Sequence, residues 1–134
     1  MSDFPRDYVT DTGHDPAEDH IGPFYYRPRD GGYDFAFKAG EHHCNVTGIV
    51  HGGVLMAFAD FAACLAATDN YADENCVTIS FNCEFLSAGQ LGDVVEAYPR
   101  VMRRTGSMVF TVGEVTASGE VLLTLSAVIK RLRK

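Results

Sequence analysis

Residues 45–67 read NVTGIVHGGVLMAFADFAACLAA, and this stretch decides the fold. Its second part, residues 54–67, is apolar on every face of a helix, which predicts a helix buried inside the protein. A single carboxylate, Asp60, interrupts this apolar run. An ionised Asp in such surroundings is costly unless it is paired, hydrated or chemically used. The misfit between Asp60 and its helix therefore marks a candidate functional site.

The composition is that of an ordinary soluble globule. The chain has 134 residues, of which 46% are hydrophobic and 22% charged, and this fits one domain with a real core. No apolar run reaches the roughly 18 residues of a membrane span. Residues 1–6 lack the basic flank and apolar core of a signal peptide. We therefore expect a cytoplasmic protein that has no membrane partner.

The net charge of −7 argues against broad nucleic-acid binding, which needs a basic face that neutralises phosphates. Positive charge is nevertheless gathered at residues 100–104 and 130–134. Solvated surface charge is one explanation of both groups. The other is a local site for a phosphorylated ligand on an otherwise acidic protein.

The cysteines and histidines do not predict a metal site. The four cysteines show neither CxxC spacing nor a secreted context. Cys64, in the apolar helix, is expected to be a small buried hydrophobe. His42, His43 and Cys44 are adjacent, but neighbouring strand residues point to opposite faces and no second cluster completes a tetrahedral set. We therefore expect no metal.

Residues 1–31 have the marks of an N-terminal extension, with several prolines and little periodicity. A short helix is expected after Asp15, which is placed as its N-cap ahead of a proline. The aromatic group at residues 24–26 is expected to pack this segment against the body. The domain proper is expected over residues 32–134.

The rest of the chain predicts strands around the buried helix. Residues 33–38 alternate apolar and polar side chains, which indicates a half-buried strand. Turn residues end the helix at 69–73, and four strands are expected after it, at 77–86, 94–104, 108–117 and 121–132. Short connections join the last three, which predicts an antiparallel meander. A helix that is apolar all round needs a sheet curled about it and a partner over any remaining face.

Residues 45–53 fit the pattern N-x-x-G-x-x-H-G-G, and Asp60 follows the histidine by nine residues. This motif resembles that of the hotdog-fold acyl-CoA thioesterases of the phenylacetate-pathway (PaaI-like) type. The strand at 77–86 and the Leu-Gly-Asp sequence at 91–93 also fit, and the resemblance covers roughly residues 32–132. It implies an α+β hotdog fold, a five-stranded antiparallel sheet wrapped around a long central helix. It also implies hydrolysis of an acyl-CoA without metal or organic cofactor, by homodimers that often pair into homotetramers.

The resemblance also implies roles for individual residues. Asp60 matches the catalytic carboxylate, as general base or as nucleophile. Gly52 matches the backbone N–H that polarises the thioester carbonyl, and Asn45 the side chain that helps to hold it. Thr78 stands where a hydroxyl residue assists the water. The residues expected to contact the substrate are Gly53, Phe85, Arg103, Arg104, Thr105, Gly106, Ser107 and Met108, the last six at the coenzyme A.

The glycine pair suits this chemistry. At a helix start it supplies unpaired N–H groups and the positive end of the helix dipole, and it lets a substrate approach the backbone closely. Beside it, His51 is included with the catalytic residues but is expected to orient the loop through hydrogen bonds. No GxSxG nucleophile elbow is present in the sequence, which excludes an α/β-hydrolase mechanism.

The spacing of the motif determines whether one chain can form the whole site. His51 and Asp60 are about 13–14 Å apart along a helix and close to half a turn out of phase. The two ends of the motif therefore cannot meet in one subunit. If both belong to one site, Asp60 of one chain works with Gly52 of another across a two-fold dimer.

The acyl group stays open between aryl and short- or medium-chain forms. Four phenylalanines line either an acyl pocket or simply the core: Phe58, Phe61, Phe81 and Phe85. A non-catalytic acyl-CoA-binding or regulatory hotdog protein is the alternative, and Asp60 argues against it. A hotdog hydratase or dehydratase does not fit the spacing of His51 and Asp60. The prediction is a homo-oligomeric acyl-CoA thioesterase.

Overall fold

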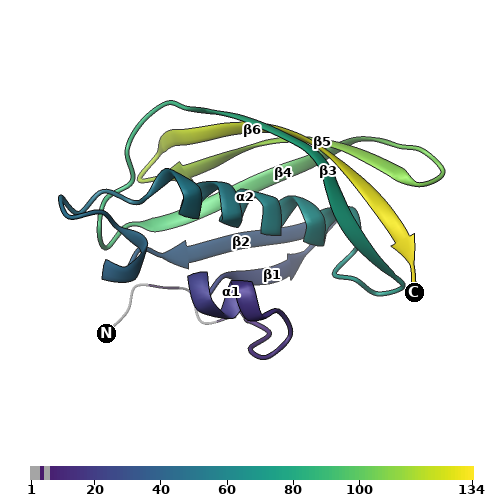
Figure 1. Ribbon diagram of the computed structural model, residues 1–134, viewed down its shortest axis with the longest axis horizontal. Coiled ribbons are helices and arrows are strands. Elements are labelled where there is room, and N and C mark those ends of the chain that lie inside the picture. The colour runs from purple at the N-terminus through teal and green to yellow at the C-terminus, as the bar shows by residue number, and fades with distance from the viewer. Residues whose placement is uncertain (1–3, 5–6) are drawn as a thin grey trace.

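A computed structural model describes Phe4 and residues 7–134 as one antiparallel sheet curled around a long helix (Figure 1). The strands, in chain order, are β1 (Tyr25–Arg29), β2 (Gly32–Lys38), β3 (Glu74–Phe85), β4 (Val94–Arg104), β5 (Met108–Ala117) and β6 (Glu120–Arg133). The helices are α1 (Pro16–Ile21) and α2 (Gly52–Ala67), with a single 3-10 turn at Glu41–His43. The order in the sheet is β1-β2-β4-β5-β6-β3. The expected α+β hotdog architecture is confirmed.

The sheet has six strands, one more than predicted. The additional strand is β1, which pairs with β2 along its whole length. Its sequence, YYRPR, contains Pro28, and proline argues against a central strand. At the edge of a sheet its missing N–H needs no partner, and β1 is an edge strand. The division into an extension over 1–31 and a domain over 32–134 stays a prediction.

The three C-terminal strands form the predicted meander, with β4 paired to β5 and β5 to β6. Ser118 and Gly119 make the tight turn between β5 and β6, with φ of 52° and 79°. Two-residue hairpins favour such left-handed conformations. β3 pairs with β6 at the other edge of the sheet. A register shift between Thr78 and Ser80 leaves Ile79 as an extra residue in β3, which is a β-bulge.

Helix α2 is buried by the sheet on most of its circumference. Nine of its 16 residues are buried, and the side chains of Phe58 and its neighbour Ala59 are 0% exposed. Of the seven others, Gly53, Met56 and Asp60 are spaced three or four apart and so lie on one side of the helix. We call them the uncovered strip of α2. Among the described residues, no helix is long and apolar enough to cross a membrane.

The N-terminal segment packs against α2 through an aromatic cluster. Asp15 is the N-cap of α1, as predicted, and accepts hydrogen bonds from the N–H groups of the first turn. Phe24 is 3% exposed. Its ring centroid lies 5.2 Å from that of Phe58, 5.4 Å from that of Phe37 and 5.5 Å from that of Phe61. The cluster therefore joins the segment before β1 to both α2 and β2.

Two adjacent histidines hold the end of α1. The buried ring of His43 accepts a hydrogen bond at Nδ1 from the Gly40 N–H at 3.0 Å and donates from Nε2 to the Ile21 carbonyl at 2.7 Å. His42 donates from Nε2 to the Gly22 carbonyl at 2.7 Å. The histidines at 42–43 thus bind backbone groups. Burial lowers the pKa of His43, which keeps its ring neutral in this arrangement.

We expect Phe24→Ala to lower the free energy of unfolding by about 3–5 kcal/mol, because truncation of a buried Phe removes its contacts and leaves a cavity. Urea unfolding followed by circular dichroism measures the change. Val46→Ala is the control, since Val46 is fully exposed, and its effect should stay within about 0.5 kcal/mol. Equal effects of the two substitutions would contradict the packing role of Phe24.

Candidate active site

Asp60 lies in the middle of α2 with one carboxylate oxygen bound to β3. The Thr78 hydroxyl donates to Oδ1 of Asp60 at 2.6 Å. The Cys64 thiol, one helical turn after Asp60, lies 3.4 Å from the Thr78 hydroxyl oxygen and 3.9 Å from the same Oδ1. No cation forms an ion pair with Asp60 within the part of the chain that the structure describes. A hydroxyl and a thiol therefore hold this carboxylate.

The second oxygen of Asp60 is available for chemistry. Oδ2 has no hydrogen-bond partner among the described residues, and Asp60 is half-buried in the uncovered strip of α2. A carboxylate fixed at one oxygen and unbound at the other is able to take a proton from water or to attack a carbonyl. The neighbouring Cys64 thiol is buried, as predicted. Its hydrogen bond with the Cys76 thiol, together with burial, raises the pKa of Cys64, so it stays a protonated donor.

The start of α2 carries a free backbone donor. His51 is the N-cap, and its Nδ1 accepts a hydrogen bond from the Gly53 N–H at 3.1 Å. The His51 carbonyl accepts from the next two N–H groups, those of Val54 and Leu55. No acceptor for the Gly52 N–H is found among the described residues. This N–H is therefore an unpaired donor at the positive end of the helix dipole.

Asn45 organises the loop before α2. Its side-chain Oδ1 accepts hydrogen bonds from the Thr47 N–H at 2.9 Å, the Thr47 hydroxyl at 2.7 Å and the Ile49 N–H at 3.1 Å. The residue is exposed. With its oxygen occupied in this way, the amide Nδ2 is the end of Asn45 that is left to donate to a ligand.

Phe85 covers the helix start from β3. Its ring atoms Cε1 and Cζ lie 3.2 Å from the position that a Cβ on Gly52 would occupy. A side chain at position 52 would need the Phe85 ring to shift by a few tenths of an ångström. The Phe85 side chain is 52% exposed, and beside it a groove of about 330 Å³ runs along the first turn of α2.

The structure brings the predicted site residues together in two groups. Asp60 and Thr78 form one group at the middle of α2, and Gly52 lies with Phe85 at its start. Gly52 and Asp60 are eight positions apart, which is about 12 Å along a helix. Within one chain, the carboxylate is therefore too far from the free N–H for one carbonyl group to contact both.

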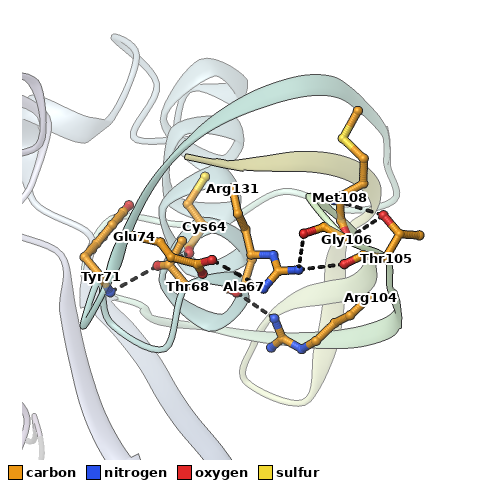
Figure 2. A network of polar contacts seen from close by, with 10 residues as sticks. All are labelled: Cys64, Ala67, Thr68, Tyr71, Glu74, Arg104, Thr105, Gly106, Met108 and Arg131. Atoms are coloured by element: carbon orange, nitrogen blue, oxygen red, sulfur yellow. Dashed lines mark hydrogen bonds and ion pairs between the residues drawn. The ribbon is translucent and has the colours of Figure 1, made fainter. Parts of the chain in front are cut away.

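The predicted coenzyme A contacts lie in the turn between β4 and β5 and in the strand ends that flank it, at the opposite end of α2 (Figure 2). The Met108 N–H donates to the Thr105 hydroxyl oxygen at 3.0 Å. Arg131 donates from Nη2 to the Thr105 carbonyl at 2.7 Å and to the Gly106 carbonyl at 3.3 Å. Arg104 donates from Nη1 to the Ala67 carbonyl at 2.8 Å, which places a cation at the negative end of the helix dipole.

The same end of α2 borders a cleft of about 610 Å³ with mixed charge. Its cationic walls are Arg104, Arg131 and Arg133, and its acidic walls are Asp69, Asp73 and Glu74. Arg103 and Ser107, two of the predicted coenzyme A contacts, are exposed near the turn between β4 and β5. The arginines therefore stand near a surface large enough for a phosphorylated ligand, with part of their donor capacity already used inside the chain.

Glu18 of α1, which no sequence pattern marks as a site residue, is a second carboxyl group near Asp60. Burial, followed by the negative charges of Asp15 and Asp60, raises the pKa of Glu18 to about 7. The residue lines a cavity of about 20 Å³ together with Phe61 and Tyr71, room for about one water molecule. The sequence carries no signal for this proximity, because α1 reaches α2 only through tertiary packing.

Comparison with known proteins gives a family match. The sequence model of the family described as "Thioesterase superfamily" matches residues 47–124 of this chain. Among curated proteins, "Putative esterase PA0474" of Pseudomonas aeruginosa is 28% identical over 116 residues, which cover 84% of this chain and 86% of that protein.

Solved structures show the same fold. The phenylacetic acid degradation-related protein of Ralstonia eutropha JMP134 is 27% identical, with a TM-score of 0.76 over 87% of this chain and 90% of that chain. The E. coli PaaI protein from the phenylacetic acid degradation operon is 17% identical, with a TM-score of 0.78 over 89% and 86%. A hypothetical thioesterase protein of Streptococcus pneumoniae TIGR4, solved with coenzyme A, is 19% identical, with a TM-score of 0.74 over 83% and 87%. At these identities the last two show likeness of fold alone.

We expect Glu18→Gln to stabilise the protein at pH 8 and to change its stability little at pH 5. The pKa of about 7 in the folded protein lies above the ordinary value of 4.5, so the folded state binds more protons between these pH values. Through this group, stability falls as the pH rises from about 4.5 to 7, and the loss is complete above 7. Glutamine does not ionise and avoids this loss.

The measurement is the thermal unfolding midpoint of both proteins from pH 5 to pH 8. Glu120→Gln, at an exposed turn, is the control and should shift the midpoint equally little at every pH. A gain for Glu18→Gln that is the same at pH 5 and pH 8 would contradict the assignment of the raised pKa to Glu18.

Proposed function

The chain belongs to the thioesterase superfamily as a thioester hydrolase of the PaaI-like hotdog type, and we propose that its substrate is an acyl-CoA with an aryl or a short- to medium-chain acyl group. The products are the free acid and coenzyme A. The coenzyme A bound to the Streptococcus pneumoniae neighbour supports an acyl-CoA substrate. One observation carries the proposal: the Asp60 carboxylate is bound through Oδ1 to Thr78, while its Oδ2 has no hydrogen-bond partner in the described part of the chain.

Asp60 promotes attack on the thioester carbonyl by one of two routes. As general base it takes a proton from a water molecule, the water oxygen adds to the carbonyl carbon, and the C–S bond breaks to release the coenzyme A thiolate, which is then protonated. As nucleophile its Oδ2 forms an anhydride with the acyl group and displaces the thiolate, and water then hydrolyses the anhydride. Thr78 holds Oδ1 in both routes, and in the first it also assists the water.

The Gly52 N–H and the Asn45 amide stabilise the negative charge that develops on the carbonyl oxygen. The free N–H at the positive end of the α2 dipole supports this role. His51 is a positioning residue, because its Nδ1 fixes the first turn by accepting from the Gly53 N–H. Gly53, without a side chain, leaves room for the substrate to approach.

The coenzyme A end of the substrate lies at the turn between β4 and β5. The guanidinium groups of Arg103 and Arg104 suit its phosphates, since arginine donates in a bidentate manner. The remaining contacts come from residues 105–108. The cleft of about 610 Å³ beside Arg104 supports this placement.

The working unit is a homodimer, two of which pair into a homotetramer in the cytoplasm. Asp60 and Thr78 of one chain act with Gly52 and Asn45 of the other across the two-fold axis. The separation of about 12 Å along α2 within one chain supports this sharing. The uncovered strip of α2, where Met56 is 38% exposed, supports a partner at this face.

Asp60→Asn should lower kcat by about 10²–10⁴-fold while the fold and the dimer persist, because it removes the base or nucleophile and keeps the side-chain volume. Thiol release from a panel of acyl-CoAs measures the loss, and circular dichroism with size-exclusion chromatography checks the structure. Near-normal turnover in this variant would remove Asp60 from the mechanism. Binding of acyl-CoA by the wild-type protein without thiol release would support the alternative of a non-catalytic binding protein.

Gly52→Pro should abolish turnover without loss of the helix. Gly52 is the first residue of α2, a position that accepts proline, and His51 before it has φ −62° and ψ 135°, the extended conformation that a following proline requires. Proline removes the N–H that is proposed to bind the oxyanion. Gly52→Ala is the matched control, since alanine meets the same Phe85 ring but keeps the N–H.

Mixed dimers of Asp60→Asn with Gly52→Pro then test whether the site is shared. Random pairing makes half of the dimers mixed, and each mixed dimer has one intact site, so activity should return to about a quarter of the wild-type value. If each site belonged to one chain, every site would carry a lesion and no activity would return. That outcome would reject the two-chain site and leave thioester hydrolysis itself in place.

A further inference from the structure

A pair of cysteine thiols joins α2 to β3 next to the Asp60 carboxylate. Cys64 lies in α2, one turn after Asp60, and Cys76 lies in β3, two positions before Thr78. The two thiols are hydrogen-bonded to each other, and Cys76 is also hydrogen-bonded to the Tyr71 hydroxyl. Neither thiol takes part in the two routes described for Asp60. The sequence predicts a buried hydrophobe at Cys64, yet its thiol contacts the polar groups of the site.

The donor and acceptor roles next to Asp60 follow from the carboxylate. An ionised carboxylate only accepts hydrogen bonds, so the single hydroxyl hydrogen of Thr78 is used on Oδ1 of Asp60, at 2.6 Å. The Thr78 oxygen is then left to accept, and Sγ of Cys64 lies 3.4 Å from it. The same Sγ lies 3.9 Å from Oδ1 of Asp60. Cys64 is therefore a donor to this pair, whichever of the two oxygens takes its hydrogen.

Cys64 ties together the two elements that the Asp60–Thr78 contact joins. It shares α2 with Asp60, and its thiol contacts Thr78 and Cys76, both of β3. The hydroxyl and methyl groups of threonine are similar in size, so packing alone does not decide which of them faces Asp60. A donor at Cys64 favours the arrangement in which the Thr78 oxygen lies between Sγ and Oδ1. Because Cys64 is only 7% exposed, water does not readily replace its thiol.

We propose that Cys64 is a positioning residue of the thioesterase site, which acts through Thr78 to fix Oδ1 of Asp60 and to leave Oδ2 for the reaction. The inference rests on the proposed function, because it requires Asp60 to act as base or nucleophile. Cys64 is not itself the nucleophile. The hydrogen bond with Cys76, together with burial, raises the pKa of Cys64, and a protonated thiol does not attack a carbonyl.

The first test measures thiol release from benzoyl-CoA and hexanoyl-CoA by Cys64→Ala and Cys64→Ser. Alanine removes one donor to Thr78 and no substrate contact, so kcat should fall about 3- to 10-fold while KM stays almost unchanged. Serine keeps a donor and should retain a higher kcat than alanine. Cys83→Ala removes another partly buried thiol of β3, outside the cysteine pair, and as the matched control it should leave kcat unchanged.

The order of the two replacements separates positioning from packing. A hydroxyl buried in apolar surroundings costs stability unless it is bonded, so a purely structural role of Cys64 predicts that serine is the worse replacement. Thermal unfolding followed by circular dichroism, with size-exclusion chromatography, checks the fold and the oligomeric state of each variant. A higher kcat for alanine than for serine, or an unchanged kcat for alanine, would overturn the inference.

A double-mutant cycle tests whether Cys64 acts through Thr78. In Thr78→Val the hydroxyl is already absent, so adding Cys64→Ala should lower kcat by less than about 2-fold. The same loss as in the wild-type background would contradict the inference, because Cys64 would then affect turnover independently of Thr78. Failure of the proposed function has a different signature, a wild-type protein that releases no thiol from either substrate, and in that case both proposals fall.

Discussion

The packing of α2 inside the curled sheet is the interaction on which the rest of this structure depends. Small side chains, such as those of Ala59 and Ala62, are 0% exposed and let the strands approach the helix closely. This packing leaves no room for a charge on the covered side. Asp60 therefore lies on the open side of the helix, where the Thr78 hydroxyl is the only polar group of β3 that meets its carboxylate among the described residues. The position of the Asp60 carboxylate thus follows from which side of α2 the sheet leaves open.

Much of the fold is predictable from the sequence, because local patterns and tertiary structure agree. The strands predicted at 94–104 and 108–117 have the observed bounds of β4 and β5, since alternating side chains and a polar turn act together there. Helix α2 begins two residues before the apolar run. Its glycines are weak helix formers, but the His51 cap compensates for them. The sequence does not predict β1, because Pro28 argues against a strand in the centre of a sheet, whereas an edge strand accepts proline.

The candidate site also has one part that the sequence predicts and another that only the tertiary structure reveals. Residue spacing along a helix predicts the separation of Gly52 from Asp60, and the structure agrees because both residues belong to the one helix α2. The hydrogen bond between Asp60 and Thr78 depends on how β3 crosses α2, which no spacing along the chain expresses. The Phe85 groove is made by four segments, and Glu18 approaches Asp60 from a fifth. Contacts between segments that are far apart in the sequence can be identified only from the tertiary structure.

The bulge at Ile79 has a consequence for how β3 serves both parts of the site. Side chains of a regular strand alternate between its two faces, so residues an odd number apart lie on opposite faces. Thr78 and Phe85 are seven positions apart, yet both contact α2, one at Asp60 and the other at Gly52. The extra residue changes the parity of β3 between them. Deletion of Ile79 would make β3 a more regular strand, and it would turn one of these two side chains away from the helix.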